Sequence, residues 1–438
     1  MEIENKLCYS QNVFPATGEV VERTARIAEN FNKIKDALKI SSATSFPLGL
    51  WLDATSAAKL ADSQIIANLK GILTTNHNTV FTVNAFPYGR FHSIGVKENV
   101  YLPDWTLRER VDYTLCVADA LVELLPAGMI GSISTLPGGY RKETQGNEAE
   151  SGENGKWKNL EEEHPTSNIQ NVGKLKARNA IAMGKKLEMI AANLREVAEY
   201  LAAIFTDKGK KIILAVEMEP DCLWESPAEF IKFRNQYLIA HPAAEEFIGV
   251  CYDTCHQELL GEIPGAGLEL LEKSGVPIPK IQLSAAINRD ICGEDDLTTA
   301  FKELAKFADG VYLHQTRLIS YDSNVLIKFE DIPSYSTVKN LFDDGAFYSK
   351  NALSSNSFKL VSHFHTPIHM DQLSDGLRTA KNELTAVLKI LSKRPANELP
   401  HLEIETYTYN VLPKELREAS LLDSMTNEYR WVMEHFEK

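Results

Sequence analysis

Five apolar runs in this chain of 438 residues end in side chains that can bind a cation or move a proton. These side chains offer carboxylate or amide oxygens and imidazole nitrogens, and they belong to Glu217, Asp253, Gln282, His363 with His365, and Glu405. Oxygen donors joined by one or two imidazoles suit Mn²⁺, Mg²⁺, Co²⁺ or Zn²⁺. We therefore predict a divalent metal ion as cofactor, with these six residues as its ligands.

Each of these acids, taken singly, also has a purely structural explanation. An acid that follows a strand can cap the next helix or pair with a nearby lysine. Acids that end several apolar strands at one place would repel one another unless a cation or shared protons neutralised them. The repetition of the pattern therefore favours a metal or catalytic cluster.

Neighbouring polar residues are candidates for proton transfer and substrate contact. The predicted catalytic residues are Glu217, Glu405 and His256, and the predicted substrate contacts are His92, Glu219, His314 and Arg317. His256 follows Asp253 by three residues. A histidine without a chemical role at the start of a helix would have the same spacing. Because side chains alternate along a strand, Glu219 is expected on the same strand face as Glu217, and Glu403 on the same face as Glu405. Each of these neighbours could orient the ligand beside it.

Strands must alternate with helices to bring such distant residues together. Strand-like runs occur at 6–12, 47–52, 79–84, 131–136, 212–217, 248–253, 278–284, 310–314, 325–329, 360–365 and 401–405. Amphipathic helices are predicted at 19–38, 57–73, 106–125, 175–205, 227–237, 268–273, 297–307, 373–391 and 413–434. Eight such units close a (β/α)8 TIM barrel, whose strand ends face one mouth.

We predict this barrel as a single domain over residues 1–438, with one or two of the runs near 312, 325 and 361 in an insertion or hairpin. An open doubly wound sheet is the alternative, but no glycine-rich phosphate turn follows the first strand. Residues 141–173, rich in Glu, Lys, Asn, Gly and Ser, are expected to form a flexible polar insertion. Residues 315–358 are expected to form an irregular insertion within the barrel.

Composition restricts the kind of partner. The 46 basic and 60 acidic residues give a net charge of −14, which would repel a nucleic acid. No apolar run reaches the roughly 20 residues that a membrane span needs, so no membrane insertion is expected. The six cysteines form no C-x-x-C pair and the chain opens without an apolar signal region, which predicts reduced thiols and a cytoplasmic location.

Several motifs resemble a known superfamily. Asp253-Thr254-Cys255-His256, Glu217 after an apolar strand and Glu405-Thr406 in the last strand resemble the xylose-isomerase-like TIM-barrel superfamily of sugar isomerases, ketose 3-epimerases and apurinic endonucleases. The runs 84–89, 100–105, 131–138, 313–315, 363–367 and 403–409 are similar to the EboE-type metabolite-traffic proteins, a bacterial branch of that superfamily.

The resemblance implies metal carboxylates at Glu217, Asp253 and Glu405, and a histidine that contacts metal or substrate at His256. Gln282 departs from the pattern because these relatives usually carry a ligand histidine at its place. His363 or His365 would compensate, since the endonuclease-like members place an acid-x-His pair in a comparable late loop.

Residues and resemblance together predict a metal-dependent isomerase of the sugar isomerase/epimerase kind, acting on a small polyhydroxylated metabolite through an enediolate. Two alternatives stay open. A non-catalytic metabolite-binding or traffic protein would keep the pocket without turnover. A metal-dependent phosphodiesterase of the AP-endonuclease-like kind would need a basic groove, which the net acidity disfavours. A homo-oligomer and functional partners from the same operon are compatible with the prediction.

Overall fold

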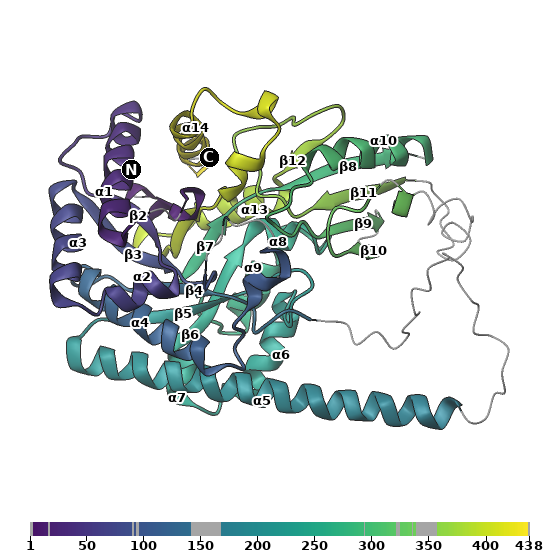
Figure 1. Cartoon of the computed structure of the whole chain (residues 1–438), viewed down its shortest axis with the longest axis horizontal. Coiled ribbons are helices and arrows are strands. Elements are labelled where there is room, and N and C mark those ends of the chain that lie inside the picture. The colour runs from purple at the N-terminus through teal and green to yellow at the C-terminus, as the bar shows by residue number, and fades with distance from the viewer. Residues whose placement is uncertain are drawn as a thin grey trace.

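Eight parallel strands form the centre of the molecule (Figure 1). The computed structural model describes residues 3–15, 18–89, 92, 96–141, 168–292, 294–320, 325–334, 336–338 and 357–436. The central strands are β1 (Leu7–Tyr9), β2 (Phe46–Trp51), β3 (Asn78–Asn84), β4 (Gly131–Thr135), β5 (Ile212–Glu217), β6 (Ile248–Asp253), β7 (Lys280–Leu283) and β13 (His401–Ile404). They pair in the order β1-β13-β7-β6-β5-β4-β3-β2, and a parallel bridge between Ser10 and Gly49 joins the two ends. The predicted (β/α)8 barrel is confirmed.

A close approach between strands makes the join between β1 and β2 depend on a glycine. A Cβ atom on Gly49 would collide with the carboxylate of Glu403 and would lie 2.9 Å from the Tyr9 carbonyl oxygen. Glu403 lies inside the barrel, where it forms an ion pair with Lys280 of β7, and both side chains are fully buried. The absence of a side chain at Gly49 therefore makes room for this buried charge pair.

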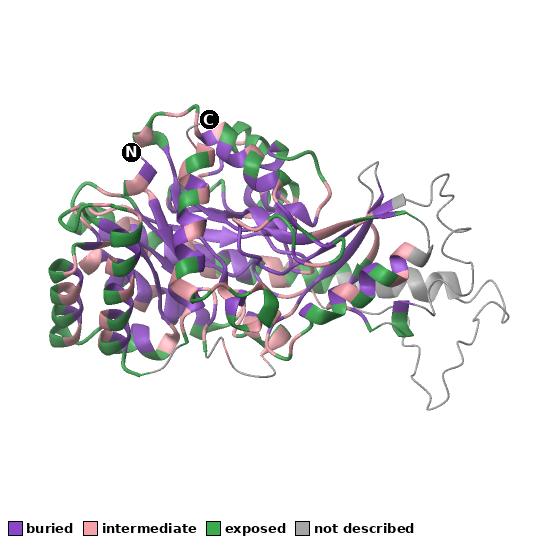
Figure 2. Ribbon diagram, turned by 90° about the horizontal axis from the view of Figure 1, so that it is seen from above, coloured by how far each residue is buried: buried purple, intermediate pink, exposed green. Residues whose placement is uncertain are grey.

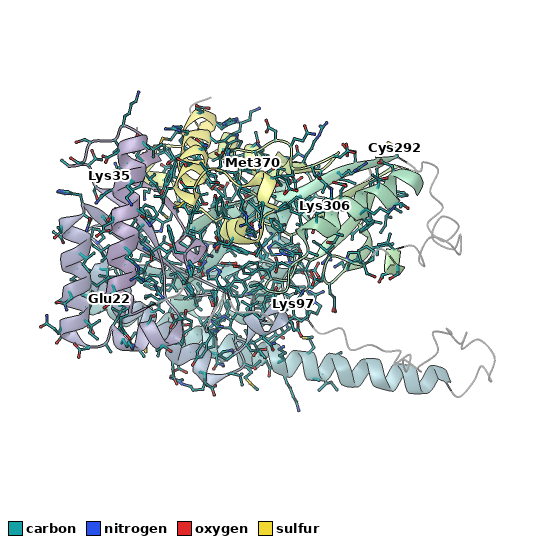
Figure 3. The ribbon with its side chains drawn as sticks, turned by 45° about the horizontal axis from the view of Figure 1, so that its top comes forward. Glu22, Lys35, Lys97, Cys292, Lys306 and Met370 are labelled. Atoms are coloured by element: carbon teal, nitrogen blue, oxygen red, sulfur yellow. The ribbon has the colours of Figure 1, made fainter. Side chains whose placement is uncertain are left out.

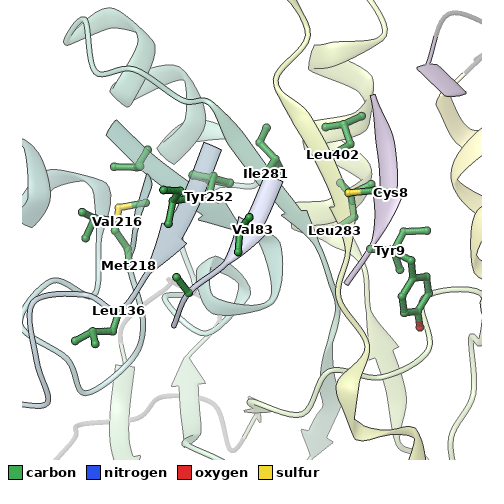
Figure 4. Packing of buried hydrophobic residues seen from close by; sticks show 14 of the residues in the cluster. Cys8, Tyr9, Val83, Leu136, Val216, Met218, Tyr252, Ile281, Leu283 and Leu402 are labelled. Atoms are coloured by element: carbon green, nitrogen blue, oxygen red, sulfur yellow. The ribbon is translucent and has the colours of Figure 1, made fainter. Parts of the chain in front are cut away.

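Helices cover the outside of the barrel, so that buried strands lie within exposed helix faces (Figure 2). They are α1 (Val20–Ala37), α2 (Ala54–Lys59), α3 (Ser63–Thr75), α4 (Arg108–Leu124), α5 (Asn168–Lys208), α6 (Pro227–Tyr237), α7 (Pro242–Phe247), α8 (Thr254–Glu258), α9 (Ala266–Lys273), α13 (Asn382–Leu391) and α14 (Leu421–Phe436). Apolar strand residues such as Val83, Val216, Ile281 and Leu402 join the buried core (Figure 4). Because side chains alternate along each strand, the intervening polar residues point into the barrel.

Two predicted helices start or break at other places than expected. Residues 57–73 form the end of α2 and most of α3, because the Asp62 carboxylate accepts hydrogen bonds from the Gln64 and Ile65 amides and starts a new helix. The last helix begins near 421 rather than 413, since the Ser420 hydroxyl oxygen accepts a hydrogen bond from the Asp423 amide. Local capping side chains decided both boundaries.

A second sheet, antiparallel throughout, is inserted between β7 and α13. Its strands are β8 (Ala286–Cys292), β9 (Thr316–Ser320), β10 (Val325–Phe329), β11 (Ser357–Ser362) and β12 (Arg378–Ala380), in the order β10-β9-β11-β8-β12. Helix α10 (Glu294–Leu304) follows β8 and covers this sheet. In Figure 3, Cys292 at the end of β8 lies on the opposite side of the molecule from Glu22 and Lys35 of α1.

The inserted sheet corrects several expectations. The runs near 325 and 361 lie in the inserted sheet, as expected for one or two of the three candidate runs, but β11 ends at Ser362 rather than at 365. Residues 310–314 form no strand, and β8 was not predicted. The helix expected at 373–391 begins at Asn382, because residues 378–380 pair with β8 after a turn at Gly376, whose φ is +78°.

The two predicted insertions lie partly outside the described residues. Within 315–358, strands β9 and β10 are regular, whereas 321–324, 335 and 339–356 are not described. Within 141–173, residues 142–167 are not described, and α5 begins at Asn168. No helix in the described part of the chain is long and apolar enough to cross a membrane.

Candidate functional site

A pocket of about 520 Å³, including its open mouth, lies where the barrel strands end. Six predicted site residues line it: Glu217, Glu219, His256, His363, His365 and Glu405. The other lining residues are Asn12, Asn84, Phe86, Pro87, Val96, Lys97, Val100, Tyr101, Val311, Tyr312, Leu313 and Tyr407. The fold therefore brings residues from both ends of the chain to one cavity.

Two glutamates of the barrel wall face this pocket with raised pKa values. Burial raises the pKa of Glu217 well above its ordinary value, and the nearby charges of Glu405 and Asp253 raise it further. Burial and the charge of Asp253 likewise raise the pKa of Glu405. The Glu405 Oε1 atom accepts hydrogen bonds from the side-chain amides of Asn12 at 2.7 Å and Asn84 at 2.8 Å. Both carboxyl groups therefore hold a proton to a higher pH than an exposed glutamate does.

The two carboxylate oxygens of Asp253 differ in their hydrogen bonds. Oδ1 accepts hydrogen bonds from the amides of Cys255 and His256, at 2.8 and 3.0 Å, and thereby caps α8. The Ser284 hydroxyl donates to the same oxygen at 2.7 Å. Oδ2 is buried and has no hydrogen-bond partner. Burial opposes ionisation, but His256, His365 and these hydrogen bonds hold the pKa of Asp253 below its ordinary value.

Gln282 lies beside Asp253 in the ladder between β7 and β6. Its side chain is fully buried, and neither its amide oxygen nor its amide nitrogen has a hydrogen-bond partner. Like Asp253, it does not line the pocket. A buried amide without a partner is costly, and a cation on its oxygen would remove part of that cost.

Two histidines of the site have their tautomers fixed by backbone carbonyl groups. The Nδ1 atom of His256 lies 3.0 Å from the Met218 carbonyl oxygen, and that of His365 lies 2.7 Å from the Glu405 carbonyl oxygen. A carbonyl oxygen only accepts, so each Nδ1 carries a hydrogen, and the lone pair of a neutral ring in this position lies on Nε2. Burial also lowers the pKa of His365 to about 4, which keeps this ring neutral.

The Nε2 atoms of His363 and His365 lie 3.1 Å apart. Burial lowers the pKa of His363 well below its ordinary value, so this ring is also neutral. With the hydrogen of His363 on Nδ1, both Nε2 atoms carry lone pairs, which repel unless a proton or a metal cation lies between them. The donor atoms of Asp253, His256 and His365 lie within 4.8 Å of one another, as do those of Glu219, His256 and His363, and those of Cys255, His363 and His365. The residues present therefore fit a divalent cation.

The six predicted ligands come from two parts of the fold. Glu217, Asp253, Gln282 and Glu405 lie at the ends of neighbouring barrel strands, whereas His363 and His365 follow β11 of the second sheet and lie near His256. Both histidines reach the mouth although their strand is not part of the barrel. His256, predicted as catalytic, lies in the histidine-rich group.

Three predicted substrate contacts do not line the pocket. Both ring nitrogens of His314 face acceptors, the His363 carbonyl at 2.7 Å and the Asp309 carboxylate at 2.8 Å. Arg317 is buried, and its guanidinium donates to Asp221 at 2.6 Å and to the backbone of β9 and β10. His92 lies behind the wall, with Nδ1 2.6 Å from the Tyr312 hydroxyl. Glu219, in contrast, does line the pocket.

Sequence reasoning missed several pocket residues. Asn12 and Asn84 follow or end barrel strands, so the rule that found Glu217 would also have found them. The Tyr407 ring contacts His365 in a tilted and Tyr312 in an edge-on arrangement, with ring centroids 4.6 and 4.9 Å away. No sequence signal marks Tyr312, because it lies in an irregular stretch before β9.

Lys97 is another pocket residue that the sequence reasoning missed. It begins the 3₁₀ helix η3 (Lys97–Tyr101) and is labelled in Figure 3. An ion pair joins it to Asp331, which follows β10. This ion pair therefore connects the second sheet to one side of the pocket mouth.

Neither a protein-family model nor a curated protein matches the sequence of this chain. Among solved structures, a xylose isomerase-like TIM barrel protein from Mycobacterium smegmatis in complex with magnesium is 8% identical, with a TM-score of 0.42 over 99% of this chain and 96% of that chain. A xylose isomerase domain protein from Alicyclobacillus acidocaldarius is 10% identical, with a TM-score of 0.31 over 64% and 73%. The 3-keto-D-glucoside 4-epimerase YcjR of E. coli is 13% identical, with a TM-score of 0.31 over 63% and 90%.

These similarities are too weak to assign an activity, and the closer resemblance to EboE-type proteins stays a prediction. The chain is a (β/α)8 barrel, as its strand order shows.

Proposed function

We propose that this protein is a metal-dependent isomerase or epimerase of a small polyhydroxylated molecule. The observation that carries the proposal is the convergence of imidazole lone pairs and unpartnered carboxylate oxygens in one pocket. Neutral imidazoles and ionised carboxylates are the forms that bind a divalent cation.

Asp253, His256, His363 and His365 are the proposed core of the metal site, and Glu219 shares a group of donor atoms with His256 and His363. Glu217, Gln282 and Glu405 are proposed as further ligands. When bound, the cation would draw electron density from adjacent carbonyl and hydroxyl oxygens of the substrate and so acidify the C–H bond between them. Asp253 would keep its Oδ1 atom on α8 and offer Oδ2 to the metal.

Glu217 and Glu405 are the proposed acid and base. Both line the pocket, come from different strands and have raised pKa values because they are buried near other carboxylates. A carboxyl group with a raised pKa is a stronger base, and can take a proton from one carbon and return it at a neighbouring atom. The Asn12 and Asn84 amides fix the orientation of Glu405 for this transfer.

The remaining pocket wall suits a molecule with both hydroxyl groups and C–H faces. Phe86, Tyr101, Tyr312 and Tyr407 supply aromatic surface, while Asn12, Asn84 and Lys97 supply hydrogen-bond donors. Such a mixture of apolar wall and few polar groups is typical of sites for small molecules.

Solvent exchange of substrate hydrogen tests the proposal. The metal-loaded protein is incubated in D₂O with a panel of aldoses, ketoses and their phosphates, and deuterium next to the carbonyl group is followed by NMR. An isomerase or epimerase of this kind incorporates deuterium only with metal present. We expect Glu217→Gln and Glu405→Gln to slow exchange by roughly 10²–10⁴-fold, and His365→Gln to lose the metal as well.

Gln257→Met serves as a matched control, because Gln257 is a buried amide that does not line this pocket. Its exchange rate should equal that of the parent. Metal binding and tight sugar retention without any deuterium exchange would replace the proposal with the metabolite-binding alternative. Cleavage of an abasic DNA duplex by the metal-loaded protein would replace it with the hydrolase.

A further inference from the structure

We infer that Gln315 is a positioning residue that sets the tautomer of His363 and orients Tyr101 and Glu219 on the other side of the pocket. Gln315 is fully buried and immediately precedes β9. It lies beside His363 because the His363 amide donates to the Gln315 carbonyl oxygen at 2.8 Å, where the ends of β9 and β11 meet. The effect of Gln315 on metal affinity rests on the proposed function.

The orientation of the Gln315 amide follows from its hydrogen-bond partners. The Nε2 atom lies 3.2 Å from the Pro220 carbonyl oxygen, which can only accept a hydrogen bond. This contact fixes which end of the amide is nitrogen. The Oε1 atom must then be the end that lies 2.6 Å from Nδ1 of His363. Because this oxygen can only accept, the hydrogen of His363 resides on Nδ1.

The second hydrogen on Nε2 of Gln315 determines the direction of the hydrogen bonds that connect Gln315, Tyr101 and Glu219. Nε2 lies 3.1 Å from the Tyr101 hydroxyl oxygen and can only donate to it. The Tyr101 hydroxyl hydrogen is therefore free to point at Glu219, whose Oε1 atom accepts it at 2.7 Å. The Oε2 atom of Glu219 has no hydrogen-bond partner.

The two ends of this network belong to the same candidate metal group. Glu219 and His363 both contribute donor atoms to the group that they form with His256. The network leaves Oε2 of Glu219 without a hydrogen-bond partner and leaves the lone pair of His363 on Nε2. The side-chain amide of Gln315 thus orients two candidate ligands, His363 and Glu219, so that each keeps a free lone pair. These two residues follow strands of different sheets. Neither a carboxylate nor an apolar side chain at position 315 could do both, because the first cannot donate and the second cannot accept.

Two variants separate these functions. Gln315→Met removes the acceptor and the donor with little change in volume, and Gln315→Glu keeps an acceptor for His363 but donates nothing to Tyr101. Protein labelled with ¹⁵N-histidine and stripped of metal is examined by two-dimensional NMR, and a His363→Gln spectrum identifies the His363 signals. We expect the Nδ1–H tautomer in the parent and in Gln315→Glu, and a mixture of tautomers in Gln315→Met.

Zinc titration of the metal-free proteins by calorimetry supplies the second readout. Loss of a group that orients a ligand typically lowers metal affinity by roughly 10–100-fold. We expect that loss in Gln315→Met, a smaller loss in Gln315→Glu, and none in Gln257→Met.

The two readouts distinguish the possible failures. An Nε2–H tautomer in the parent, or an unchanged Nδ1–H tautomer in Gln315→Met, would overturn the role of Gln315. If the parent binds no zinc, the proposed function fails, while the tautomers of the metal-free proteins still decide the role of Gln315.

Discussion

At the level of single residues, the barrel interior is unusual in the number of ionisable groups that it buries. Glu217, Asp253, Glu403 and Glu405 are nearly inaccessible to water, and Lys280 lies among them. The positive charge of Lys280 lowers the pKa of Glu217 and Glu405, although burial and the neighbouring acids outweigh it. This lysine therefore offsets part of the repulsion that the acids create.

We expect Lys280→Met to be strongly destabilising, because it leaves Glu403 buried without its partner. Breaking a buried ion pair from one side costs roughly 3–5 kcal/mol. Urea unfolding at pH 7 measures the loss. The double variant Lys280→Met/Glu403→Gln should recover most of it, and equal losses in the single and double variants would show that the pair has no such role.

Asp253 combines a structural and a chemical function that two substitutions can separate. Asp253→Asn keeps an oxygen that accepts from the Cys255 and His256 amides, so the fold should lose less than about 1 kcal/mol while metal binding is lost. Asp253→Ala should cost about 1–2 kcal/mol more. Metal analysis and urea unfolding of the two variants check this. Full metal content in Asp253→Asn would contradict the proposed ligand.

At the level of elements, helix α14 is tied to the barrel through one buried acid. Glu428 accepts hydrogen bonds from the hydroxyl groups of Tyr9 and Thr406, at 2.6 and 2.7 Å, and from the Ile368 amide at 3.0 Å. Burial raises its pKa from 4.5 to about 7, despite these donors. The contact between α14 and the barrel therefore depends on pH.

Because the folded protein binds this proton more tightly than the unfolded chain, the contribution of Glu428 is fully present below pH 4.5 and is lost as pH rises through about 7. The shift corresponds to at most about 3 kcal/mol. Glu428→Gln removes the titration and keeps an acceptor. Unfolding in urea at pH 5, 6, 7 and 8 should therefore show a smaller decline for the variant than for the parent. Parallel pH profiles would contradict this.

At the level of the whole molecule, closure of the barrel between β1 and β2 depends on the space at Gly49. Gly49→Ala would press a methyl group against Glu403 and the Tyr9 carbonyl, and overpacking of this kind costs roughly 1–3 kcal/mol. Gly71→Ala is the matched control, because nothing lies within 4 Å of the added atom and Gly71 lies inside α3. We expect the control to gain about 0.5–1 kcal/mol, as measured by thermal unfolding. A Gly49→Ala protein as stable as the control would show that β1 and β2 tolerate separation.

The sequence by itself determined the barrel and most of its mouth. Residues such as Glu217, Asp253 and Glu405 end runs whose alternation and length are local properties, and in parallel strands the same end always faces the same side. For that reason Glu217 and Glu405, which line the pocket, could be placed at the mouth without coordinates. The tautomers of His256 and His365 could not, because they depend on carbonyl groups that are close only in the folded chain.

Only the tertiary structure decided how the inserted segment contributes. The pairing of β8 with β11 joins residues about 70 positions apart, such as Asn288 and Val361, and no local pattern encodes such a partner. That pairing places His363 and His365 at the mouth and turns His314 and Arg317 into buried structural groups. Sequence patterns specify which face of an element is apolar, whereas the choice between ligand, substrate contact and structural hydrogen bond is made by the groups that folding brings together.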